Sequence, residues 1–191
     1  MGDLGMMDFT PTAQQISLHG LVFIQVRLGG NQRLHVWHPD LPRRSCYEHS
    51  SIHNHRFSFM SHVLVGTQVN RRWKVRPAED GSHDRISHDG ARSDKGGRLS
   101  YVAERVSIEE YFPGADEVYA AGQYYHMPML QYHETPNAGI VVTLLRKLDE
   151  GDKHASSLIT HGHDFDQGFD RFQMSEDDLW RVVLDAMRSA A

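Results

Sequence analysis

Short runs of alternating apolar and polar residues dominate this chain and predict β-strands. The runs occupy residues 21–28, 33–37, 57–66, 67–75, 99–112, 116–121, 124–133 and 138–147. A period of two places alternate side chains on opposite faces of a strand. Gly, Pro and Asn punctuate the runs, and the segment GGNQ between the first two predicts a hairpin. The pattern favours an all-β fold, an antiparallel β-barrel or jelly roll, over alternating β-α-β units.

Two segments depart from this alternation. Residues 77–98 are polar and glycine-rich, and we expect a loop between strands there. Residues 175–189 predict one C-terminal α-helix, because Ser175 stands at an N-cap position before an acidic first turn. Leu179 and Val183 then fall on one helical face, which we expect to pack on the outside of the barrel. We interpret residues 1–191 as a single domain with a barrel core at about 20–148.

Composition and charge narrow the function classes. The net charge of −5 offers no basic surface for nucleic acid or for an anionic membrane, so neither is expected as a partner. Cys46 is the single cysteine, which excludes a disulfide framework and favours a cytoplasmic localisation. The first residues lack the basic and apolar regions of a signal peptide, and no apolar run has the length of a membrane span.

A pair of histidines one residue apart, His53 and His55, opens one of the alternating runs. The chain has 14 histidines, so one such pair is expected by chance, and His161 and His163 form a second in a polar segment. On a strand, His53 and His55 would share a face with Phe57 and the apolar positions after it. Two imidazoles at the end of an apolar face can converge on one metal ion. Local geometry permits such a site without requiring it.

A second segment, GQYYHMPMLQYHETPN, supplies a partner for this pair. It runs Gly122, five residues, Pro128, one residue, Leu130, two residues, His133, three residues, Asn137. This order and spacing resemble the second motif of the cupin superfamily, which has glycine where Leu130 stands.

The first cupin motif also resembles a stretch of this chain. His53 and His55, three residues, Phe59, six residues and Gly66 follow its spacing. Phe59 replaces the motif glutamate, and Tyr47 stands where the family has a glycine before the first histidine. The two motifs together cover residues 47–137.

The resemblance implies a small cupin whose barrel holds a divalent metal through His53, His55 and His133. Phe59 cannot ligate, so the site would be a neutral three-histidine face that favours an anionic, chelating substrate. Imidazole suits several ions, so Zn, Ni, Mn and Cu stay open beside Fe(II), which the resemblance favours. The three-histidine pattern is similar to that of thiol and diketone dioxygenases. The Ser-His-Tyr relay of thiol dioxygenases has no counterpart in GIVVTLLRK, which speaks against thiol oxidation.

We therefore expect an Fe(II)-dependent dioxygenase that acts on a small polar or anionic metabolite with O2. His126 and Tyr125 are the candidates for proton handling. Arg27, Arg56 and Arg72 are the candidates to bind a substrate carboxylate. The alternatives are a metal-dependent isomerase, lyase or hydrolase on the same scaffold, and a cupin that binds a small molecule without catalysis. By resemblance, a homodimer is a further expectation.

Overall fold

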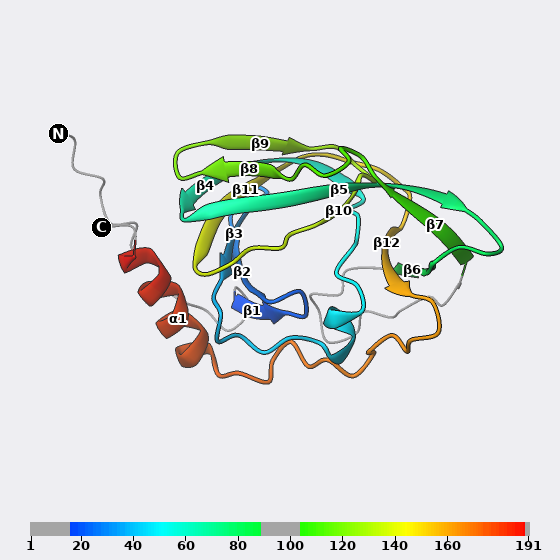
Figure 1. The fold of residues 1–191 in the computed structure, drawn as a ribbon. Helices are drawn as coiled ribbons and strands as arrows, with labels where there is room; N and C mark the ends of the chain where they lie inside the picture. Colours follow the sequence, from blue (N-terminus) through cyan, green and yellow to red (C-terminus); the bar gives the residue numbers. More distant parts are fainter. Residues whose placement is uncertain (1–15, 89–103, 190–191) are drawn as a thin grey trace.

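Two antiparallel sheets face one another in a jelly-roll-like sandwich, which confirms the predicted all-β fold class (Figure 1). The computed structural model describes residues 16–88 and 104–189. The first sheet contains, in order, β1 (Ile16–His19), β2 (Phe23–Leu28), β3 (Gln32–Trp37), β11 (Val141–Glu150), β4 (Phe57–Val65) and β9 (Tyr124–Met127). The second contains β10 (Tyr132–Glu134), β5 (Thr67–Pro77), β7 (Glu104–Glu110), β6 (His83–His88) and β12 (Ala155–Thr160), and β8 (Glu117–Ala120) pairs with β5. The described strands form two sheets and no closed barrel.

Several elements follow the sequence pattern. The hairpin at GGNQ joins β2 to β3, and Gly30 and Asn31 take the positive φ angles of 67° and 64° that such a turn needs. The helix α1 (Glu176–Arg188) has Ser175 as its N-cap, and the Ser175 hydroxyl accepts a hydrogen bond from the Asp178 amide. These predictions are confirmed.

Other elements differ from the expectation. Part of the predicted loop 77–98 is strand β6, which pairs with β7 and β12, while residues 89–98 lie outside the described ranges. Strand β6 was missed because Ile86 is its one buried residue, so it shows no apolar alternation. Strands β1 and β12 extend the sheets beyond the expected core of 20–148. The run 124–133 is two strands, because a turn at Pro128 separates β9 from β10.

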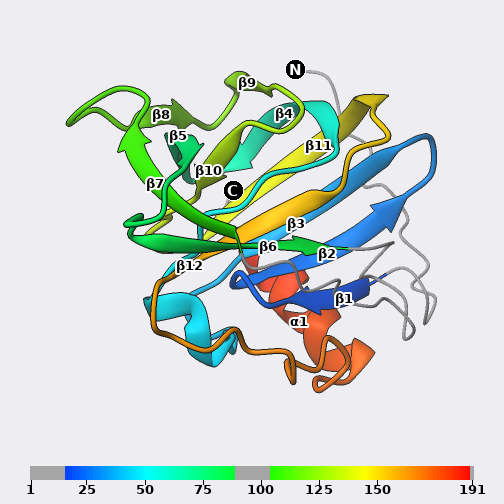
Figure 2. The same ribbon diagram turned by 90° about the vertical axis from the view of Figure 1, so that its right-hand side faces the viewer.

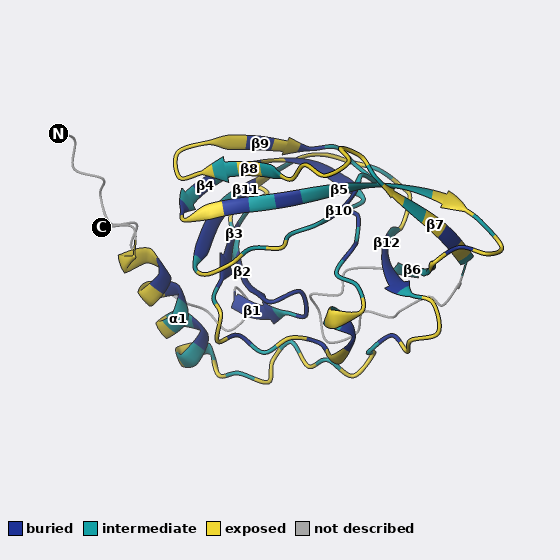
Figure 3. Cartoon of the chain, viewed as in Figure 1, coloured by how far each residue is buried: buried dark blue, intermediate teal, exposed yellow. Residues whose placement is uncertain are grey.

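The first sheet is covered on its outer face by α1. Figure 2 shows β1, β2 and β3 side by side with α1 against them, and Figure 3 shows the dark, buried side of the helix turned to the strands. Leu179 and Val183 of α1 pack there against a purely apolar cluster. Its strand members are Ile16, Leu18, Ile24, Val26, Leu34, Val36, Val65 and Val142. No helix in the described ranges is long and apolar enough to cross a membrane.

The inner face of the same strands is built differently. The alternate positions of β2, β3 and β11 turn toward the second sheet, and they carry polar and aromatic side chains. These include Phe23, Gln25, His35, Trp37 and Thr143, all less than a tenth exposed. Register pairs His35 with both Gln25 and Thr143, so three polar side chains lie in a row across the sheet. This face lines the hollow between the two sheets.

Candidate metal centre

The histidine pair lies on a short extended segment that fills the gap between β10 and β12. His53 and His133 exchange both backbone hydrogen bonds, each at 2.9 Å, so their side chains lie on the same side of the pairing. On the other flank, the Leu158 amide donates to the Ile52 carbonyl at 2.9 Å. The Asn54 side chain accepts a hydrogen bond from the Ser156 amide at 2.7 Å. The residue between the two histidines therefore fixes the segment, and alternation sends both imidazoles inward.

Three imidazoles converge as a result. The ring centroids of His53 and His133 are 4.5 Å apart, those of His53 and His55 4.9 Å, and those of His55 and His133 5.2 Å. Each residue offers a nitrogen, and these nitrogens all lie within 4.8 Å of one another. In the described ranges, this is the group that gathers three potential metal ligands. The second H-x-H pair, His161 and His163, is exposed.

The environment keeps these three imidazoles neutral. Burial lowers the pKa of His53 to about 4 and lowers the pKa values of His55 and His133 well below the usual 6.5. The His53 Nδ1 lies 2.9 Å from the Ser51 carbonyl oxygen, and a neutral ring donates its proton there. The Nε2 lone pair is then left for a ligand, as is typical of metal-binding histidines. The Gln131 backbone interacts with the His133 ring and raises its pKa, a smaller effect than that of burial.

Aromatic side chains surround the cluster. The Phe59 ring, in the place of the motif glutamate, lies 5.4 Å from the His55 ring and 6.5 Å from the His133 ring. The cluster borders a cavity of about 30 Å³ whose wall also contains Trp37 and Leu145. The three-histidine group includes no carboxylate from the described part of the chain. A divalent ion held there would keep its full positive charge, and the residues fit such an ion.

The turn before His133 explains part of the second motif. Pro128 to Gln131 form a turn in which Leu130 has a φ of 62°, the left-handed conformation that a type II turn requires at this position. Leu130 stands where the cupin motif has glycine, so the backbone keeps the conformation that glycine adopts without strain. The Leu130 amide donates to the His55 carbonyl at 2.8 Å, which ties the turn to the histidine segment. After His133, the Asn137 side chain accepts from the Val69 amide at 2.8 Å.

The two candidates for proton handling lie on opposite sides of β9. Tyr125 is buried and lines the cavity beside the cluster, and burial raises its pKa to about 12. Its phenol therefore stays protonated and can donate a hydrogen bond near neutral pH. His126 is exposed, pairs with Met60 on β4, and is absent from the cavity wall. The structure does not bring His126 to the cluster.

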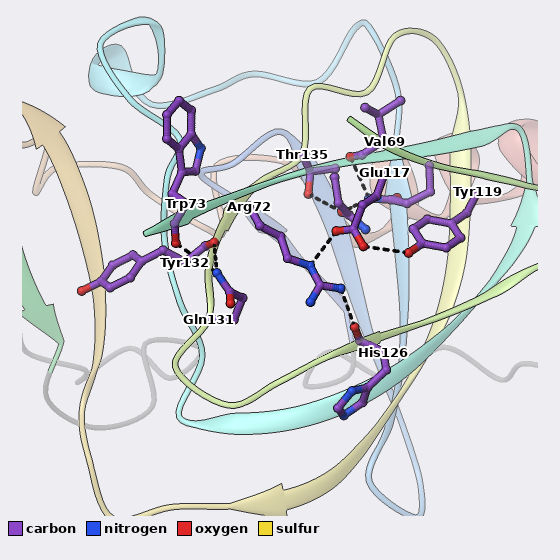
Figure 4. Close-up of polar contacts among 11 residues, drawn as sticks. Val69, Arg72, Trp73, Glu117, Tyr119, His126, Gln131, Tyr132 and Thr135 are labelled. Atoms are coloured by element: carbon purple, nitrogen blue, oxygen red, sulfur yellow. Dashed lines mark hydrogen bonds and ion pairs between the residues drawn. The ribbon is translucent and has the colours of Figure 1, made fainter. Parts of the chain in front are cut away.

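The expected substrate anchors are also separated. Arg72 forms an ion pair with Glu117 at 2.6 Å and donates to the His126 carbonyl, so it braces two strands (Figure 4). Arg27 is absent from the walls of the two cavities that border the cluster, whereas Arg56 lines the second of them. The sequence analysis named Arg56 but none of the other cationic side chains in the wall of this second cavity. Its other cations are Arg33, Arg44, Lys147 and Arg171.

Comparisons with known proteins do not identify a function for this chain. No family model matches the sequence, and no curated protein matches it. The two-sheet sandwich and the cluster of His53, His55 and His133 are compatible with a cupin. The arrangement could hold a divalent metal ion.

Proposed function

We propose that this chain is a cupin-type enzyme that holds Fe(II) through His53, His55 and His133 and uses it as a dioxygenase on a small polar or anionic metabolite. The observation that carries the proposal is the convergence of three neutral imidazoles without a carboxylate. When bound, the iron would supply the redox chemistry with O2 and an attachment point for a chelating substrate. A neutral ligand set favours an anionic chelating group, because it leaves the charge of the ion uncompensated.

The protein's own residues would prepare the site in three ways. The Ser51 carbonyl orients His53 by accepting its Nδ1 proton, which also fixes the tautomer. Phe59 and Trp37 present apolar surface beside the cluster and exclude water from it. Tyr125 keeps its proton and presents a neutral phenol beside the cluster, where it also interacts with Ser61 and Asn70.

Oxygen consumption tests this proposal. The protein would be loaded with Fe(II) under nitrogen and offered small diketones, thiols and carboxylates in an oxygen electrode. We expect substrate-dependent O2 uptake in the wild type and its loss in His133→Ala. His62→Ala is the matched control, because His62 stacks on Tyr124 at 4.1 Å and lies outside the cluster.

Two outcomes would contradict the proposal. Turnover of a substrate without O2 uptake would assign the site to isomerisation, elimination or hydrolysis, with zinc as a suitable ion. Binding of a substrate with unchanged affinity in His133→Ala and no turnover would assign the chain to the non-catalytic class.

A further inference from the structure

A second cavity, of about 160 Å³, also borders His53 and His55. The two cavities share Leu21, His53 and His55 in their walls, so the second reaches the histidine cluster directly. We call it the cationic chamber, after five side chains in its wall: Arg33, Arg44, Arg56, Lys147 and Arg171. Its described wall contains no Asp or Glu.

Arg33 and Lys147 bring two of these charges together across the inner face of the first sheet. The Arg33 guanidinium lies 5.5 Å from the centre of the Phe57 ring, and the Lys147 ammonium lies 4.2 Å from it. Arg33 donates to the Gln25 side chain at 2.9 Å, a neutral partner. Burial, followed by repulsion from Arg27, lowers the pKa of Arg33 to about 10. Burial and the charge of Arg33 likewise lower the pKa of Lys147. Both cations would gain from a negative charge nearby.

Arg44 contributes a third charge from deeper in the wall. Arg44 is 8% exposed, and its Nε has no hydrogen-bond partner among the described residues. Gly20 makes room for it, because a Cβ there would lie 2.6 Å from the Arg44 Nε. The guanidinium rests 4.7 Å from the centre of the Phe165 ring. A buried guanidinium nitrogen without an acceptor is costly, and an anionic ligand would satisfy it.

Carboxylates beside the chamber offset only part of this charge. Glu150 pairs with Arg56 at 2.6 Å and lies 3.7 Å from the Lys147 ammonium. Asp166 acts on Arg44 by charge, while its Oδ2 accepts hydrogen bonds from the Ser45 amide and hydroxyl. Glu150 also acts on Arg33 by charge, but among the described residues neither Arg33 nor Arg44 forms an ion pair with a carboxylate.

We propose that the cationic chamber binds a small organic dianion and places its other end at the three-histidine cluster. A single negative charge would leave Arg33 or Arg44 without an anionic partner, whereas a phosphate group or two carboxylates would engage both, with Lys147 beside them. The chamber is well below the roughly 300–1,000 Å³ typical of drug-sized ligands, so it suits a metabolite of a few carbon atoms. The role as a substrate site rests on the proposed function, but the binding of the anion does not.

The test is isothermal titration calorimetry of the metal-free protein in a zwitterionic buffer at low salt. The probes are inorganic phosphate, malonate and acetate. We expect saturable binding of a dianion at least about tenfold tighter than that of acetate, because each charged hydrogen bond contributes about a factor of ten or more. Preference for phosphate would identify a phosphorylated substrate, and preference for malonate a dicarboxylate.

Charge-removing variants locate the site. Lys147→Gln and Arg33→Gln should each weaken dianion binding about tenfold. Arg146→Gln is the matched control, since Arg146 precedes Lys147 on β11 and is exposed on the other face. Circular dichroism verifies that each variant folds. Equal binding of acetate and the dianions, no saturable binding by wild type, or an equal effect of Arg146→Gln would each overturn the proposal.

His133→Ala separates this inference from the proposed function. The variant should lose the metal and keep dianion binding in the metal-free titration. Dianion binding in a protein that never takes up metal would leave the chamber in place and remove the dioxygenase. Metal uptake without a preference for dianions would remove the proposed anion site and leave the proposed dioxygenase in place.

Discussion

The two faces of the first sheet contrast sharply, although the same strands build both. On the outer face, positions such as Ile24 and Val36 pack with α1 in a cluster that is entirely apolar. On the inner face, one residue along the same strands, Gln25 and His35 are also buried but polar. His35 Nε2 and the hydroxyl of its neighbour Thr143 have no hydrogen-bond partner. Packing on the outer face stabilises the fold. Buried polar groups on the inner face cost stability beside the histidine cluster.

The contrast indicates that the inner face, with its buried polar side chains, contains the candidate functional site. Burying a polar group without a partner costs about 1–3 kcal/mol, so a sheet that does so repeatedly on one face is poorly explained by packing. Here His35 lines the cavity beside the histidine cluster, and Arg44, with an unpartnered Nε, lines the cationic chamber. Substitutions on the two faces should therefore have opposite consequences.

The largest effect is expected on the outer face. Leu179→Ala removes a side chain that is 2% exposed and should lower the free energy of unfolding by about 2–5 kcal/mol. Leu184→Ala, on the exposed side of α1, should change it by less than about 0.5 kcal/mol. Urea unfolding measures both. A similar small cost for both variants would show that α1 does not stabilise the sheet.

A pH-dependent effect should come from the inner face. Burial lowers the pKa of His35 to about 3, with charge from Arg33 and His53 adding to it. Below pH 6.5 the unfolded chain binds a proton at this residue that the folded protein refuses, so stability falls as pH falls toward 3. The slope from His35 alone is up to about 1.4 kcal/mol per pH unit.

Urea unfolding of the metal-free protein at pH 7.5 and 5.5 measures this loss. His35→Leu should reduce the difference between the two pH values, because Leu cannot titrate. An unchanged difference in the variant would show that His35 is not held neutral in the folded protein.

The smallest effect has the opposite sign. Thr143→Val replaces a fully buried hydroxyl without a partner by a methyl group of the same shape. We expect the free energy of unfolding to stay level or rise by about 1 kcal/mol, with the metal content unchanged. Thermal unfolding would measure it. A loss of more than about 1 kcal/mol would mean that the hydroxyl has a structural role after all.

The sequence predicted the elements whose patterns are local. A period of two and turn residues gave most strands, and Ser175 with Leu179 and Val183 gave the helix. The spacing of two motifs gave His53, His55 and His133, which the structure brings together. Neighbouring residues on a strand face opposite sides, so Tyr125 and His126 of β9 cannot both face the interior.

The rest depends on pairings that are distant in the chain. Arg33 and Lys147 are indistinguishable from solvated strand residues until β11 lies between β3 and β4 and both cations flank Phe57. Arg44 lies outside the strands, and its packing against Gly20 and the Phe165 ring buries it. Strand β6 is too polar to show a pattern, and its partners β7 and β12 define it.

Metal content measured by mass spectrometry tests the central claim most directly. Wild type, His133→Ala and His62→Ala would be purified untagged under nitrogen and compared. The account predicts about one divalent ion per chain in the wild type and in His62→Ala, and its loss in His133→Ala, because three imidazoles are needed to hold the ion. Wild type without metal after loading with Fe(II) or Zn(II), or equal metal in all three proteins, would contradict it.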